Sequence, residues 1–113
     1  MLREPLMKLA IEYFRRRGYK IERVGQSGAS SSTGSSKIDF IIIKQDEMHP
    51  VLVKEWNRTV GVNVVINFDK ASQDKRFSNP ILISEKFSEH AKAYANRRGI
   101  KLITRSEIIR SLA

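Results

Sequence analysis

Charged residues interrupt two apolar segments of this sequence. Asp39 lies in the run over residues 38–43, and Lys54 lies in the run over residues 50–56. Burying a charged side chain is costly unless it is paired or functional, so both residues need a physical reason. A carboxylate that holds Mg²⁺, beside a lysine that activates water and offsets phosphate charge, would suit hydrolysis of a phosphodiester. An ion pair across a sheet edge is the structural alternative.

The two apolar runs are predicted to be the strands of a β-hairpin, because only a short polar segment separates them. If the turn is centred between residues 46 and 47, Asp39 lies directly opposite Lys54. Ile41 then lies opposite Leu52. Side chains alternate between the two faces of a strand, so all four residues share one face. The sequence therefore predicts that the acid and the lysine meet on the same side of a sheet.

Hydrophobic periodicity places the first elements of the chain. Apolar residues at helical spacing predict a helix over residues 5–17, and Gly18 follows its basic end. A strand is expected over residues 19–24. Residues 26–36 are rich in glycine and serine and are expected to form a loop, which is either a plain connection or a place where backbone amides approach phosphates.

Helix and strand signals alternate in the second half of the chain. Residues 60–73 fit a strand, because they are rich in β-branched residues, and also fit a helix, because apolar positions recur at helical spacing. Composition alone does not decide between them. The later predicted elements are a strand over 80–84, a helix over 87–98, a strand over 100–103 and a short final helix that begins with a capping box of Thr104 and Glu107.

Length and charge limit the class of protein. With 113 residues, of which 41% are hydrophobic, residues 1–113 suffice for a single domain with one core. Lys and Arg number 21 against 12 Asp and Glu, which leaves a net charge of +9, so nucleic acid is the first candidate partner. The basic residues are dispersed, and a well-solvated surface is the alternative. Cysteine is absent, which excludes disulfides and thiolate metal sites.

Targeting signals are the next feature that the sequence can test. The first residues contain no uninterrupted apolar core followed by a small-residue cleavage site. No apolar run approaches the roughly 20 residues that a membrane span requires. On these grounds we expect a cytoplasmic protein without a membrane partner.

The order and spacing of these segments resemble the PD-(D/E)xK nucleases, which place an Asp on one hairpin strand and Glu-x-Lys on the next. The string IDF followed by VLVKEWNRTVG is similar to those two strands, and the hairpin is as long as in archaeal Holliday junction resolvases. ILISEKFSEHAKAYANRRGIKLIT is similar to the strand-helix-strand ending of Mrr-type domains. The resemblance runs from Leu6 to about Ile109. It implies an α/β restriction-endonuclease-like fold, a mixed central β-sheet flanked by helices in the order α-β-β-β-α-β-α-β-α, with a helix over 61–73.

The resemblance also implies roles for residues of the hairpin. Asp39 would be a catalytic and metal-binding carboxylate, Lys54 the catalytic lysine, and the main-chain carbonyl of Val53 a further metal ligand. The cofactor implied is Mg²⁺ or Mn²⁺ for an active enzyme and none otherwise. Leu52 departs from the pattern, because the family has Glu or Gln there and leucine cannot bind a metal. Three other acids are candidate replacement carboxylates: Glu4, Glu12 and Glu55. Strand alternation directs Glu55 away from Lys54. Glu4 and Glu12 lie before and within the first predicted helix, on which the resolvases carry an acid where this chain has Met7.

Two functional hypotheses follow from this combination. The first is a DNA-binding, metal-dependent endonuclease or resolvase-like protein in which cutting is weakened or lost because the motif Glu is Leu52. The second is a non-catalytic pseudonuclease subunit that binds DNA or a protein partner. Resolvase-like proteins act as dimers, so the resemblance implies a homodimer. Trp56 is interpreted as a packing residue, with base stacking as the alternative. Nucleic-acid contacts are expected from Ser35, Ser36, Lys37, Lys54 and Arg58.

Overall fold

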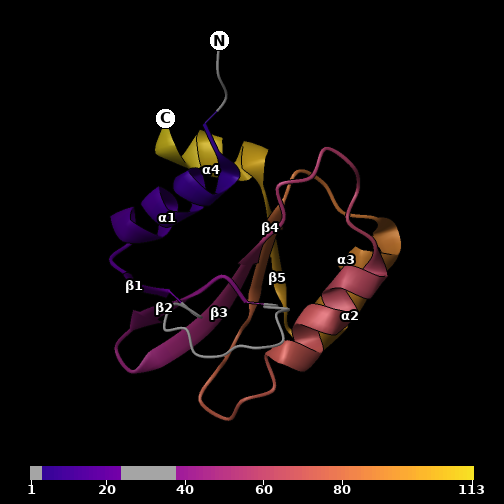
Figure 1. Ribbon diagram of the computed structural model, residues 1–113, viewed down its shortest axis with the longest axis horizontal. Coiled ribbons are helices and arrows are strands. Elements are labelled where there is room, and N and C mark those ends of the chain that lie inside the picture. Colours follow the sequence, from indigo (N-terminus) through magenta and orange to yellow (C-terminus); the bar gives the residue numbers. More distant parts are fainter. Residues whose placement is uncertain (1–3, 24–37) are drawn as a thin grey trace.

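Five strands form one mixed sheet in the computed structural model, which describes residues 4–23 and 38–113 (Figure 1). Their order in the sheet is their order along the chain. The first two pairs are antiparallel, whereas the last two pairs are parallel because a helix crosses over between their strands. The strands are β1 (Lys20–Arg23), β2 (Phe40–Lys44), β3 (Glu47–Val53), β4 (Ile81–Ser84) and β5 (Lys101–Thr104).

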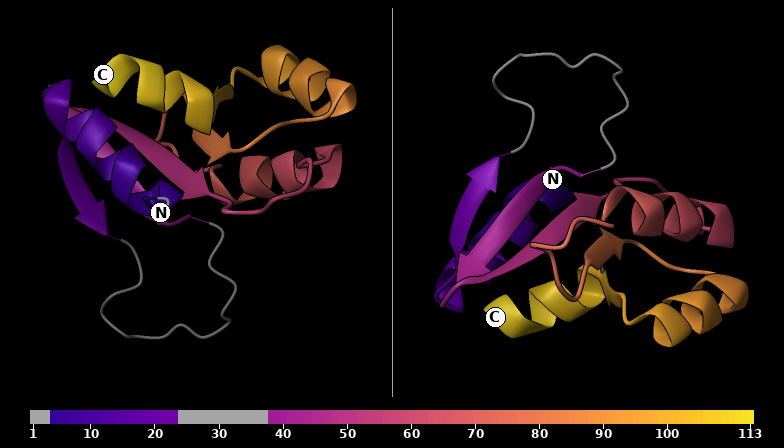
Figure 2. Two further views of the ribbon diagram at one scale, coloured as in Figure 1. Left: turned by 90° about the horizontal axis from the view of Figure 1, so that it is seen from above. Right: turned by 90° about the horizontal axis from the view of Figure 1, so that it is seen from below.

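Helices cover both faces of the sheet (Figures 1 and 2). One core lies between the first and last helices and the face that carries Phe40, Ile42 and Val51, and a second core lies between the middle helices and the face of Leu52 and Leu82. Alternation along β3 separates the two cores. Among the described residues, no helix is both long enough and apolar enough to cross a membrane. The helices are α1 (Leu6–Arg16), α2 (Val62–Ala71), α3 (Glu89–Arg98) and α4 (Arg105–Leu112).

The predicted element order and fold class are confirmed. The segment that composition left open is the helix α2, and it buries Val65 and Phe68, which lie three positions apart on one helical face. Thr104 and Glu107 form the predicted capping box of α4. The strand expected over 50–56 begins and ends earlier, so the lysine of interest follows β3 instead of lying within it.

The turn between β2 and β3 lies one position earlier than predicted. Gln45 and Asp46 both have positive φ, 51° and 74°, and Lys44 pairs with Glu47 across them. A two-residue turn with positive φ at both positions matches the twist of the strands that it joins. The turn is therefore centred between residues 45 and 46.

The register of the hairpin corrects one prediction about the site. Asp39 does not lie opposite Lys54, and Ile41 pairs with Pro50 instead of Leu52. The paired register ends at Phe40 and Val51, so Asp39 lies just beyond it, where its N–H and carboxylate bond to Val51 and Val53. The difference amounts to two residues along β3, and side chains alternate with a period of two, so the predicted common face is retained.

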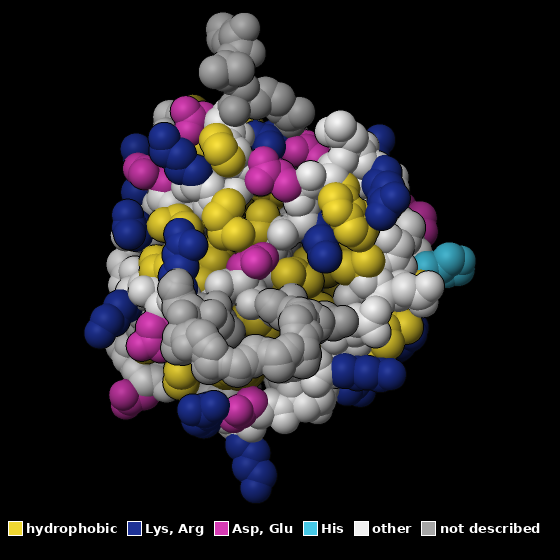
Figure 3. Space-filling model, in the orientation of Figure 1, with side chains coloured by type: hydrophobic (Ala, Val, Ile, Leu, Met, Phe, Trp, Pro, Cys, Tyr) yellow, Lys and Arg dark blue, Asp and Glu magenta, His cyan; other side chains and the backbone are white. Residues whose placement is uncertain are grey.

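Basic side chains are spread over the surface. On the face drawn in Figure 3, Lys and Arg stand mostly around the margin, while hydrophobic side chains gather towards the centre. The net charge of +9 therefore does not mark a binding face without further information.

Candidate nucleic-acid interface

The carboxylate of Asp39 extends the hydrogen-bond ladder of the hairpin. The Asp39 N–H donates to the carbonyl of Val51 at 2.8 Å, and its Oδ2 accepts the N–H of Val53 at 2.7 Å. Burial raises the pKa of Asp39 above its ordinary value of 3.8. The Val53 N–H and the positive charges of Lys54 and Arg23 oppose that rise. One carboxylate oxygen is thus used by the fold itself.

Lys54 follows β3 at the edge where the parallel strands end. Its N–H donates to the carbonyl of Ile83 at 2.8 Å, and its own carbonyl accepts the hydroxyl of Ser84 at 2.6 Å. These two bonds hold the main chain just beyond the strand. The ammonium Nζ of Lys54 lies 4.9 Å from the centroid of the Trp56 ring.

Arg58 shares that aromatic ring with Lys54. Its Cζ lies 4.2 Å from the centroid of Trp56, and its side chain is exposed. Trp56 is partly buried against the core that α2 and α3 cover. A surface pocket of about 400 Å³ is lined by Glu55, Trp56, Asn57 and Arg58. Two cations and one aromatic ring therefore lie at the edge of the sheet that also carries Asp39.

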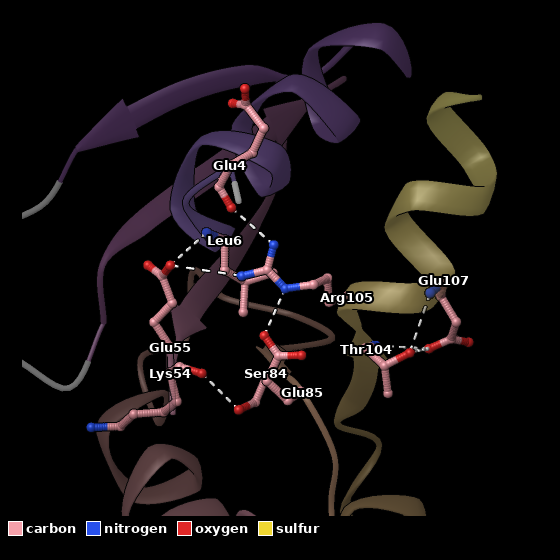
Figure 4. A network of polar contacts seen from close by, with 9 residues as sticks. All are labelled: Glu4, Leu6, Lys54, Glu55, Ser84, Glu85, Thr104, Arg105 and Glu107. Carbon is pink, nitrogen blue, oxygen red and sulfur yellow. Dashed lines mark hydrogen bonds and ion pairs between the residues drawn. The ribbon is translucent and has the colours of Figure 1, made fainter. Parts of the chain in front are cut away.

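Arg105 joins several segments of the chain at this edge (Figure 4). Its side chain is only 11% exposed and donates to the carboxylate of Glu85 at 2.6 Å and to the carbonyl of Glu4 at 2.9 Å. It also lies 3.8 Å from the carboxylate of Glu55. The same Glu55 oxygen accepts the N–H of Leu6, the first residue of α1, at 2.8 Å. Glu55 thereby satisfies one of the free N–H groups at the start of the helix.

The candidate replacement carboxylates are engaged elsewhere. Glu4 and Glu12 form ion pairs with basic residues one helical turn later, and both carboxylates are exposed. Glu55 is directed towards α1, as strand alternation predicted. Among the contacts of the described residues, none joins any of the three to Asp39 or Lys54. The structure does not bring these acids into the site.

The donor set does not fit a resident divalent cation. Mg²⁺ demands near-octahedral oxygen ligation, and Leu52, at the position where the resemblance implies Glu or Gln, is 6% exposed and offers no donor. No three Asp, Glu, His or Cys side chains form a metal-binding group among the described residues. The rest of the sequence, residues 1–3 and 24–37, contains none of these four residue types. The Val53 carbonyl, predicted as a ligand, would have a single carboxylate beside it.

Of the predicted nucleic-acid contacts, the structure brings Lys54 and Arg58 together around one ring. Ser35, Ser36 and Lys37 lie outside the described residues, as does the Gly/Ser-rich loop. The assignments of those three residues remain predictions.

Three residues of this edge were missed by sequence reasoning. Arg23 pairs with Phe40 across β1 and β2, and only this strand pairing brings its charge to bear on Asp39. Ser84 is a fully buried polar residue that ends an apolar strand, and this pattern could have indicated a specific hydrogen bond. Arg105 carries no comparable signal, because it sits in a helix start of ordinary composition.

The mixed sheet, with an Asp and a Lys where its central hairpin opens, defines an α/β restriction-endonuclease-like fold. The crystal structure of AF1548, a protein of unknown function, is similar with a TM-score of 0.74 and 18% identity over 95% of this chain and 65% of that one. The MspJI restriction endonuclease, solved in complex with a 27-mer oligonucleotide, is similar with a TM-score of 0.62 and 16% identity over 95% of this chain and 26% of that one. This chain therefore spans less than two thirds of either protein. No curated protein matches it.

The Mrr_cat family model, described as a restriction endonuclease, matches residues 1–112. The chain belongs to this family. The resemblance drawn from the hairpin and from the strand-helix-strand ending is thereby confirmed.

Proposed function

We propose that this domain binds DNA at the edge that carries Lys54 and Arg58, and that its own cutting activity is weakened or lost. The observation that carries the proposal is the buried Leu52, two residues before Lys54, in a site that keeps Asp39 and the cations Lys54 and Arg58. Such a site keeps its attraction for phosphate and lacks the second carboxylate that would hold Mg²⁺. The oligonucleotide complex of MspJI supports DNA as the polyanion.

The described residues support contact with the nucleic-acid backbone. The ammonium of Lys54 and the guanidinium of Arg58 are donors suited to phosphate oxygens. Contacts to phosphate carry no direct sequence information, so we expect little preference among bases and a steep fall in affinity with salt. We assign no hydrolytic step, because the donor set does not hold the metal that the chemistry of the family implies.

The proposal is tested by incubating the protein with labelled four-way junction, duplex and single-stranded DNA in Mg²⁺, Mn²⁺ or EDTA. Binding and cleavage are measured on the same samples, with Lys54→Ala and Arg58→Ala as site variants. We expect binding that persists in EDTA, weakens in both variants, and is accompanied by little or no product. Metal-dependent cutting at enzymatic rates that is lost in Lys54→Ala would show an active nuclease and refute the loss of activity.

A homodimer is part of the proposal, because resolvase-like proteins meet two strands symmetrically. Sedimentation of the protein with and without four-way junction DNA measures the assembly directly, and a monomer in both conditions would exclude the homodimer.

Absence of affinity for all three DNAs at low salt would overturn DNA binding. That result would favour the non-catalytic subunit that docks a protein partner.

A further inference from the structure

The ring of Trp56 carries two cations at the proposed interface. The Nζ of Lys54 lies 4.9 Å and the Cζ of Arg58 lies 4.2 Å from its centroid. Both distances fall within the range in which a cation is attracted to an aromatic face, and indole is the strongest of the aromatic partners. The ring therefore holds two flexible basic side chains close together, although their charges repel.

These two cations keep their donors for another partner. Among the described residues, no carboxylate lies within ion-pair distance of Lys54 or Arg58, whereas Arg76, Arg98 and Arg105 each pair with a carboxylate. A stacked guanidinium retains its N–H donors in its own plane, where a phosphate can accept a pair of them. An ammonium above a ring also keeps hydrogens that point away from it.

We infer that Trp56 is a positioning residue that orders Lys54 and Arg58 into a single phosphate-binding unit. Its ring is partly buried against the core and so has little freedom of its own. Cations that are already placed by such a ring lose less conformational freedom when a phosphate binds. This inference rests on the proposed DNA binding, and it gives the tryptophan a role other than packing or base stacking.

A double-mutant cycle measures whether the tryptophan acts through the arginine. Affinity for one duplex at fixed salt is compared among wild type, Trp56→Leu, Arg58→Ala and the combined variant. We expect Trp56→Leu to weaken binding by about five-fold, as loss of a cation–π contact would, and Arg58→Ala to weaken it at least as much, because it removes the guanidinium itself. The combined variant should lose clearly less than the product of the two single losses, because without Arg58 the ring positions only Lys54. Losses that multiply would overturn the inference.

Two controls separate positioning from damage to the fold. Trp56→Phe keeps an aromatic face and should recover much of the affinity that Trp56→Leu loses, and thermal melts identify any variant that fails to fold. Tyr13→Leu removes a similar contact on α1, where the Cζ of Arg17 lies 4.4 Å from the Tyr13 ring, and it should leave affinity unchanged. Wild-type protein that binds no DNA would overturn the proposed function and the inference together, whereas multiplying losses in a protein that binds would overturn the inference alone.

Discussion

The environment of Asp39 favours the protonated form of its carboxyl group. Burial outweighs the Val53 N–H and the nearby positive charges, so the pKa of Asp39 is raised above 3.8. Between pH 3.8 and the raised pKa, Asp39 keeps its proton in the folded protein, whereas the unfolded chain has released it. Asp39 therefore supports the fold most at pH values below 3.8, and this contribution is lost as the pH rises through the raised pKa.

Replacing Asp39 by asparagine should remove this pH dependence. The amide oxygen of Asp39→Asn can still accept the N–H of Val53, and it carries no charge to desolvate. We expect the variant to be at least as stable as wild type near neutral pH, with a difference in melting temperature that shrinks as the pH falls towards 3.8. Thermal melts of both proteins over the acidic range measure this difference. A variant that is clearly less stable at neutral pH would show that the fold needs the charge.

Leu52→Glu should create a metal site on the same face. The new carboxylate would stand on the strand next to Asp39, but Leu52 is 6% exposed, so the metal-free variant should lose about 2 kcal/mol of unfolding free energy. We expect Mn²⁺ to raise the melting temperature of Leu52→Glu and to leave wild type unchanged. Leu52→Met is the matched control, because it has a similar size and offers no oxygen donor to the metal. A variant that does not respond to Mn²⁺ would place the defect elsewhere in the site.

At the scale of elements, one buried guanidinium holds the starts of α1 and α4 against the ends of β3 and β4. Arg105→Met should destabilise the fold by about 3 kcal/mol, because it removes the cation that faces the carboxylates of Glu55 and Glu85. Urea unfolding measures this loss, and Arg105→Lys should recover part of it by keeping the charge. A loss well below 1 kcal/mol for Arg105→Met would show that helix and strand packing alone fixes this corner.

At the scale of the whole molecule, the net charge of +9 attracts any polyanion at long range, whereas only cations that contact phosphate release counterions. Lys54→Ala and Lys101→Ala change the net charge equally, but Lys101 begins β5 and so lies at the opposite end of the parallel strands. We expect Lys54→Ala to reduce the slope of log affinity against log salt by about one, and Lys101→Ala to leave the slope unchanged. Equal effects of both substitutions would mean that binding follows overall charge instead of this edge.

Some elements could be predicted from local patterns, and others could not. The capping box of α4 depends on residues three apart, so Thr104 and Glu107 identified it from sequence. The helix α2 was ambiguous by composition and was decided by the family resemblance. The prediction of the hairpin register failed because Gln45 and Asp46 adopt positive φ, and no glycine in the sequence indicates a turn at these positions.

By itself, the sequence determined the two apolar strands and the common face of Asp39 and Lys54. These two features follow from alternation and residue type, which depend only on neighbours along the chain. The missing donor at Leu52 was recognised only from the family resemblance. The tertiary structure alone decided that Arg23 acts on Asp39, and that Glu55 serves a helix start and a buried guanidinium instead of a metal. Those contacts join residues far apart in the chain, and their distances are set by strand pairing and helix crossover, which no local pattern encodes.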